Sequence, residues 1–143
     1  METMETITAE MIDVAEAIGA CQKALAWLRA EPRQWREVPA DWRRWLASNP
    51  AIAEFPALAL MLARDPDVFV RWAPAANAVL GALPAVALVL ARDRRREVRR
   101  GLAGNPALAS LPGVVAVLAN DPDVNVRREL AGNAALAAAA GAT

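Results

Sequence analysis

Three short segments of the chain are apolar on every side, and each is followed by a turn signal and a second helical segment. They read PALALMLAR, PAVALVLAR and PGVVAVLAN, and they open on Pro56, Pro84 and Pro112. Proline suits the first position of a helix, because the amide hydrogen that it lacks would have no partner there. A helix that is apolar all round is buried on both faces. The pattern therefore predicts pairs of short helices in which the first helix is buried.

This pattern repeats every 28 residues, as Asn49, Asn77, Asn105 and Asn133 illustrate. A pair of such short helices cannot bury its own apolar face, so stacking of neighbouring pairs must supply the core. Strand patterns are nearly absent. We therefore expect one all-α domain built as a solenoid. Its parts are a flexible lead, an N-terminal helix and loop, a degenerate half repeat, three repeats and a partial repeat: 1–7, 8–36, 37–48, 49–76, 77–104, 105–132 and 133–143.

Local signals predict where the second helix of each unit begins and ends. One aspartate per unit stands where an N-cap belongs: Asp65, Asp93 and Asp121. Gly104 and Gly132 stand where a left-handed C-cap is expected. In the first unit Pro74 replaces the leucine of the equivalent positions, so we expect the helix to break near Trp72.

The segment from Thr8 to Ala30 carries an apolar stripe with three- and four-residue spacing, which predicts one amphipathic helix. The stripe consists of Met11, Val14, Ile18, Cys21, Leu25 and Leu28. We expect this helix to dock on the first repeat and cap it. Because Cys21 lies on the stripe, we expect it to be a small buried hydrophobe and not a reactive thiol.

The composition narrows the possible chemistry. The chain has 143 residues, 16 basic and 16 acidic side chains, one cysteine and no histidine. These counts exclude an intrachain disulfide, Cys/His zinc sites and histidine-based acid–base catalysis. The sequence has no phosphate-binding loop and no nucleophile elbow. We therefore expect no enzymatic activity, no metal and no cofactor.

The N-terminal segment METMETITAE is acidic and lacks the basic start of a secretory signal. No apolar run approaches the roughly 20 residues of a transmembrane helix. A single thiol suits a reducing compartment. We expect a cytoplasmic protein without a membrane partner.

The segment LAGNPALASLPGVVAVLANDPDVNVRRELAGN resembles the leucine-rich repeat variant family, and the six-residue spacing from aspartate to arginine is similar to HEAT-type repeats. The resemblance covers residues 37–136. It implies a right-handed superhelix of α-helices and short 3₁₀ helices, with the 3₁₀ segments at NPAI, NAVL and NPAL. It also implies a binding surface and no particular activity.

By analogy with HEAT-like stacks, the repeated Asp–Arg pairs cap helices and bridge neighbouring units. The pairs are Asp65 and Arg71, Asp93 and Arg99, and Asp121 and Arg127. The four repeated asparagines are expected to bond to turn backbone. We interpret both series as a structural ladder, not as a ligand site.

The stretch ARDRRREVRR departs from the repeat at Arg94, Arg95 and Arg96, which replace proline, aspartate and valine. Arginines in the first turn of a helix oppose its dipole by about 0.3–1 kcal/mol each. The departure indicates either an anion-binding surface or drift on an exposed edge. We expect Trp72 to border the same surface.

Arginine and tryptophan are common anchors of protein interfaces. The candidate partner-binding residues are therefore Arg94, Arg95, Arg96, Arg100, Trp72 and, in the N-terminal loop, Trp35.

The leading hypothesis is a protein-binding scaffold for an acidic partner, such as a bacterial adaptor or an immunity-type inhibitor. The first alternative is a binder of nucleic acid or phosphate. The zero net charge argues against an extended nucleic-acid footprint. The second alternative is a structural module that self-assembles through the apolar C-terminal segment AALAAAAGAT.

Overall fold

The computed structural model describes residues 6–31 and 33–141, and within them every named element is a helix. The first part of the chain forms α1 (Ala9–Ala17), α2 (Gln22–Ala30), the 3₁₀ helix η1 (Trp35–Glu37) and α3 (Ala40–Ser48). Three similar groups follow: η2 (Pro50–Glu54), α4 (Pro56–Ala63) and α5 (Val68–Ala76); η3 (Leu80–Ala82), α6 (Pro84–Ala91) and α7 (Arg96–Ala103); η4 (Pro106–Ser110), α8 (Pro112–Ala119) and α9 (Val124–Ala131). The last helix is α10 (Ala134–Gly141).

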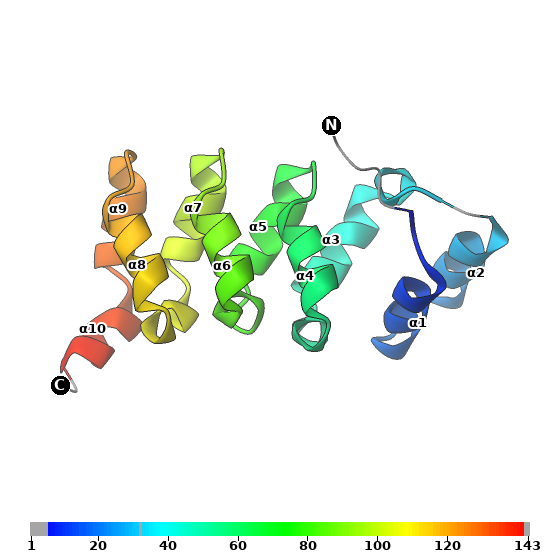
Figure 1. Cartoon of the computed structure of the whole chain (residues 1–143), viewed down its shortest axis with the longest axis horizontal. Coiled ribbons are helices and arrows are strands. Elements are labelled where there is room, and N and C mark those ends of the chain that lie inside the picture. Colours follow the sequence, from blue (N-terminus) through cyan, green and yellow to red (C-terminus); the bar gives the residue numbers. More distant parts are fainter. Residues whose placement is uncertain (1–5, 32, 142–143) are drawn as a thin grey trace.

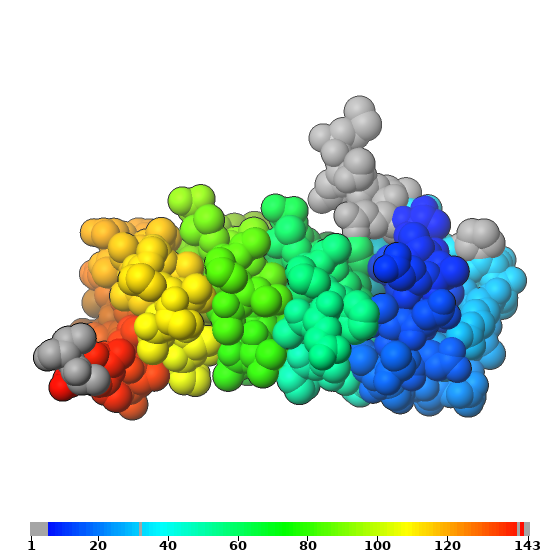
Figure 2. Space-filling model, turned by 60° about the horizontal axis from the view of Figure 1, so that its bottom comes forward, coloured from blue at the N-terminus to red at the C-terminus, as the bar shows by residue number. Residues whose placement is uncertain are grey.

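The helices lie in two rows (Figure 1). One row contains α4, α6 and α8, and the other contains α3, α5, α7 and α9, with contacts between successive members of each row. In the space-filling view the bands from red and orange through yellow and green follow one another in sequence order, and the blue N-terminal part lies at the far end (Figure 2). Each group therefore packs mainly on the groups next to it in the sequence, with α1 and α2 at one end and α10 at the other.

The core runs through this arrangement as layers of equivalent side chains. The layers include Leu62, Leu90 and Leu118 from the first row, and Val70, Val98 and Val126 from the second, all at most 1% exposed. The prolines begin α4, α6 and α8 as the sequence predicts. Two of the expected 3₁₀ segments, NPAI and NPAL, overlap η2 and η4, whereas η3 begins only at Leu80, the last residue of the expected NAVL segment.

The predicted N-caps are wrong by two residues. The caps of α5 and α9 are Asp67 and Asp123, whose side chains accept hydrogen bonds from the second and third residues beyond them. Asp65 instead accepts from the Asp67 amide at 2.9 Å and closes the preceding turn. The first aspartate thus shapes the turn and the second caps the helix, which sequence spacing alone did not separate.

Two predictions about helix ends are also wrong. Gly104 and Gly132 end their helices at φ of −85° and −86°, so neither needs the left-handed conformation. Helix α5 does not break at Trp72 but continues through Pro74 to Ala76. Because Pro74 lies in the last turn, the helix loses only the bond that its amide would make, and the Asn77 amide still reaches the Ala73 carbonyl at 3.1 Å.

The predicted single N-terminal helix is two helices. Gly19 adopts a φ of +99°, which favours glycine, and the chain turns there between α1 and α2. Cys21 lies at the start of α2 and is exposed, so the prediction of a buried thiol is wrong. The turn moves this position off the stripe that a continuous helix would bury.

The helices α1 and α2 share a small apolar cluster with α3, in which Ile12 and Leu25 pack with Leu46. The rings of Trp27 on α2 and Trp42 on α3 meet edge to face, with centroids 5.4 Å apart. Of the lead predicted over residues 1–7, residues 1–5 lie outside the described part of the chain. Thr6 and Ile7 are held in place, because Thr6 pairs with Gln34 and the Ile7 amide donates to the Arg33 carbonyl.

Candidate interaction surface

The repeated arginines and aspartates form a ladder of buried ion pairs between neighbouring units. Each arginine pairs with the aspartate 22 residues later, as Arg71 Nε does with Asp93 Oδ2 at 2.7 Å. Arg71 Nη1 also donates to the Asp65 carbonyl at 2.8 Å, within its own unit. The equivalent pairs are Arg43 with Asp65 and Arg99 with Asp121. Arg127 makes the bond within its unit, to the Asp121 carbonyl.

The repeated asparagines form a second ladder between units. Each side-chain oxygen accepts from the amide two residues later, as predicted for a turn. The side-chain nitrogens reach the preceding unit. Asn105 donates to the carbonyls of Ala75 and Asn77, Asn133 donates to those of Ala103 and Asn105, and Asn77 donates to that of Ser48.

Trp35 belongs to the arginine ladder and not to the surface. Its side chain is buried, and its indole nitrogen donates to Asp65 Oδ2 at 2.6 Å. The prediction of Trp35 as an exposed partner-binding residue is therefore wrong. It contributes to the first ion pair of the ladder, because Arg43 Nε donates to the same Asp65 oxygen.

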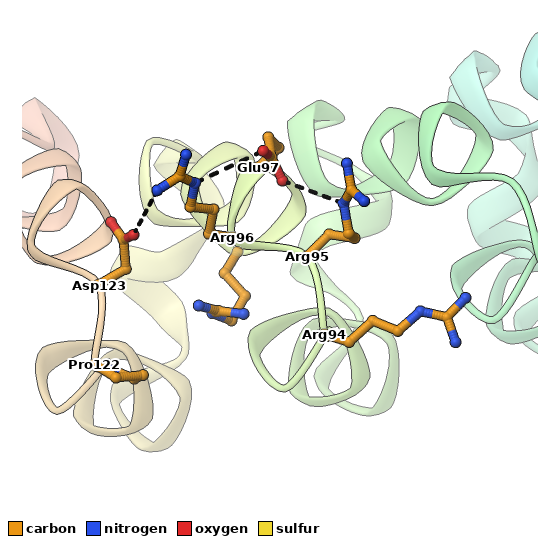
Figure 3. Close-up of a pocket in the computed structure, with 7 residues that line it drawn as sticks. Arg94, Arg95, Arg96, Glu97, Pro122 and Asp123 are labelled. Atoms are coloured by element: carbon orange, nitrogen blue, oxygen red, sulfur yellow. Dashed lines mark ion pairs between the residues drawn. The ribbon is translucent and has the colours of Figure 1, made fainter.

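The Arg94–Arg96 turn differs from its counterparts because arginine replaces the capping aspartate. Arg95 occupies the N-cap of α7 and makes no side-chain cap bond. All three arginines are exposed. Together with Glu97, Arg99, Pro122 and Asp123 they line an open pocket of about 460 Å³ (Figure 3). The pocket lies between the unit of α7 and the unit of α9.

Two of these arginines have acidic neighbours. Arg95 lies 3.5 Å from Glu97, and Arg96 lies 3.7 Å from Glu97 and 3.5 Å from Asp123 in the next unit. Arg94 forms no such pair within the described residues, and it extends away from Asp123 (Figure 3). Arg96 therefore bridges two units, whereas Arg94 is the arginine most available to a partner.

The pKa values of the two carboxyls follow from this setting. The backbone amide of Glu97 lowers the pKa of its own carboxyl against the opposing effect of desolvation, and Arg95 and Arg96 lower it further. Desolvation raises the pKa of Asp123, but hydrogen bonds from the amides of Asn125 and Val126, together with Arg96, lower it overall. Both groups are therefore carboxylates at neutral pH, which offsets part of the arginine charge.

The sequence reasoning missed an aromatic face on α3 and α5. We define it by Phe69 and Trp72, which are 62% and 41% exposed, together with Arg44. The guanidinium of Arg44 lies 5.9 Å from the centroid of the Phe69 ring, so the two helices contribute to one surface. The three-residue spacing of Phe69 and Trp72 could have indicated a shared helix face, but nothing in the sequence separated it from packing.

Trp72 is seated against the next helix of its row. A Cβ added at Gly101 would lie 2.8 Å from Trp72 Nε1, so the indole lies over the glycine of α7. Arg100, the next residue of α7 toward the N-terminus, is exposed and lies 3.5 Å from Glu129 on α9. The seat of Trp72 is thus in the second half of α7, whereas the Arg94–Arg96 turn precedes or begins that helix.

No group of three or more potential metal ligands occurs among the described residues. None of the helices described is both long and apolar enough to span a membrane. No protein-family model matches the chain, and neither a curated protein nor a solved structure matches it significantly.

Proposed function

We propose that the chain is an α-solenoid of 28-residue units, of the leucine-rich repeat variant or HEAT-like type, that binds another protein without catalysing a reaction. The ladders support this proposal, because the same Arg–Asp bond joins successive units. The alternation of 3₁₀ and α-helices also supports it. Stacks of this kind present an extended surface to partners.

One observation gives the main support for a binding function. Phe69 and Trp72 lie exposed on α5, and Arg44 of α3 lies beside the ring of Phe69, while the leucine and valine layers of the core are buried. Tryptophan and arginine are enriched among the residues that dominate binding energy at protein interfaces. The exposed arginines favour an acidic partner.

The test is affinity capture from the native host with the full chain as bait. The variant is Arg94→Ala/Arg95→Ala/Arg96→Ala, and the charge-matched control is Lys23→Ala/Arg36→Ala/Arg128→Ala, at exposed positions elsewhere. We expect the wild type and the control to recover the same partner and the variant to recover less. If all three recover the same proteins equally, the turn does not bind the partner.

The uncapped start of α7 favours phosphate binding as a second candidate. A gel shift with random duplex DNA at several salt concentrations distinguishes phosphate binding from protein binding. A salt-sensitive shift that the triple variant loses would replace the protein-binding proposal with a nucleic-acid one. Light scattering across concentration tests the third candidate, self-assembly.

A further inference from the structure

We propose that the aromatic face is the anchor site for an acidic peptide segment of the partner, one that carries apolar side chains beside aspartate or glutamate. The proposal rests on the function proposed above and adds where the partner binds and what chemistry it presents. The candidate site is thereby shifted from the Arg94–Arg96 turn alone to α3 and α5.

The exposure of the face is the first argument. Within residues 6–31 and 33–141, Phe69 and Trp72 are two of the six exposed large hydrophobic residues, and the others are Trp45, Val79, Leu88 and Val124. Tryptophan and phenylalanine bury a large apolar area on binding, and two of them three residues apart on α5 make a hydrophobic centre of the kind found in interfaces. A partner must therefore supply apolar side chains.

The restricted conformation of these side chains is the second argument. Trp72 lies over Gly101, and Arg44 lies near the ring of Phe69. Contacts on one side restrict the rotamers of both aromatic residues before a partner arrives. Side chains that are already ordered lose less entropy on binding.

The charge around the face is the third argument. Arg44 lies within it, Arg64 is exposed in the turn before α5, and Arg94 of the next unit is exposed and points away from Asp123 (Figure 3). The exposed acid on α3 is Asp41, while Asp67 caps α5. Arg95 is partly neutralised by Glu97. The excess of arginine next to an apolar centre matches a segment with carboxylates beside its apolar anchors.

The experiment selects peptides from a random 12-residue display library on the full chain. The binders are then synthesised, and their Kd values are measured for the wild type and for the variants Phe69→Ala, Trp72→Ala and Arg94→Ala. Leu88→Ala, an exposed apolar residue on α6, is the matched control. Circular dichroism of each variant verifies that its helices are intact.

We expect the selected peptides to be rich in aspartate, glutamate and apolar residues. Each aromatic substitution should weaken their binding by about 30-fold, as for an interface anchor. Arg94→Ala should reduce the dependence of Kd on salt, and Leu88→Ala should leave Kd unchanged. Failure to select acidic peptides, or binding that ignores both aromatic substitutions, overturns the proposal.

Failure of this proposal can be told from failure of the proposed function by repeating the affinity capture with Phe69→Ala/Trp72→Ala as bait. A partner that the wild type and this variant recover equally leaves the protein-binding function in place and removes the aromatic face from it. If the wild type binds neither a selected peptide nor a partner protein, the protein-binding function itself is wrong.

Discussion

The α5–α7 junction and the α7–α9 junction have the same buried bonds. In the first, Arg71 pairs with Asp93 at 2.7 Å, and in the second, Arg99 pairs with Asp121 at 2.7 Å. At both, the arginine also binds a backbone carbonyl of its own unit. A buried charge without such partners is costly, so each new junction requires the same set.

The exposed sides of the two junctions differ. At the first, the indole of Trp72 lies over Gly101. At the second, the equivalent contact is an ion pair between Arg100 and Glu129, and Arg96 adds a pair with Asp123. Packing and desolvation therefore constrain the inner side, whereas solvent leaves the outer side free to become aromatic in one place and charged in another.

The first prediction tests whether the inner sides are equivalent. Arg71→Ala and Arg99→Ala should each lower the free energy of unfolding by about 3–5 kcal/mol, because each leaves a buried aspartate without its counter-charge. Urea denaturation measures both. A difference above about 1 kcal/mol between them would mean that the two junctions are not equivalent inside.

The second prediction concerns the asparagine ladder at the first junction. A Cβ at Gly81 would overlap Nδ2 of Asn105, which donates to the carbonyls of Ala75 and Asn77. Gly81→Ala should therefore destabilise the protein by about 1–3 kcal/mol in a thermal or urea melt. Gly113→Ala is the control, because no atom lies within 4 Å of the added carbon. Equal effects of the two substitutions would contradict the packing argument.

The third prediction tests the seat of Trp72. Gly101→Ala gains about 1 kcal/mol of helix propensity but pushes on the indole, so the net change in stability should be below about 1 kcal/mol. The indole N–H resonance of Trp72 should shift and exchange faster with water, as measured by NMR. The signals of Trp27 and Trp35 serve as internal controls. An unchanged Trp72 signal would place the indole elsewhere.

The fourth and smallest effect is electrostatic and belongs to the second junction. Arg96→Gln should raise the pKa of Asp123 toward its ordinary value, because one of the groups that lower it is removed. The amides of Asn125 and Val126 remain and keep part of the shift. A carbon-detected NMR titration measures it.

The lowered pKa of Asp123 determines how the stability of the protein changes with pH. The contribution of the Asp123 carboxylate is present above its unfolded pKa and is lost as pH falls through the lower folded pKa. The variant should therefore lose less stability on acidification over this range. An unchanged pKa would show that Arg96 does not act on Asp123 in solution.

The all-helical fold was predictable from the sequence because its signals are local and repeated. Proline at the first helical position, all-round apolar segments and the 28-residue series of asparagines needed no knowledge of distant contacts. The prediction of a single N-terminal helix was wrong because it also used local signals alone. The apolar stripe continues past Gly19, but its +99° φ turns the chain and exposes Cys21.

The candidate site was only partly predictable. The substitutions at Arg94, Arg95 and Arg96 stand out against the repeat, and all three are exposed. Trp35 and Trp72 could not be distinguished by sequence alone, yet the first is buried against Asp65 and the second is 41% exposed. The difference depends on which neighbouring unit covers each indole.

The sequence by itself determined the helix pairs, their period and the residues that interrupt it, because local spacing controls helix formation and binary patterning. Only the tertiary structure decided that Arg71 pairs with Asp93 in the next unit, that Arg96 reaches Asp123, and that Phe69 and Trp72 are exposed on α5. Those outcomes depend on how one unit is placed against the next, and burial and charge pairing at each junction fix that placement.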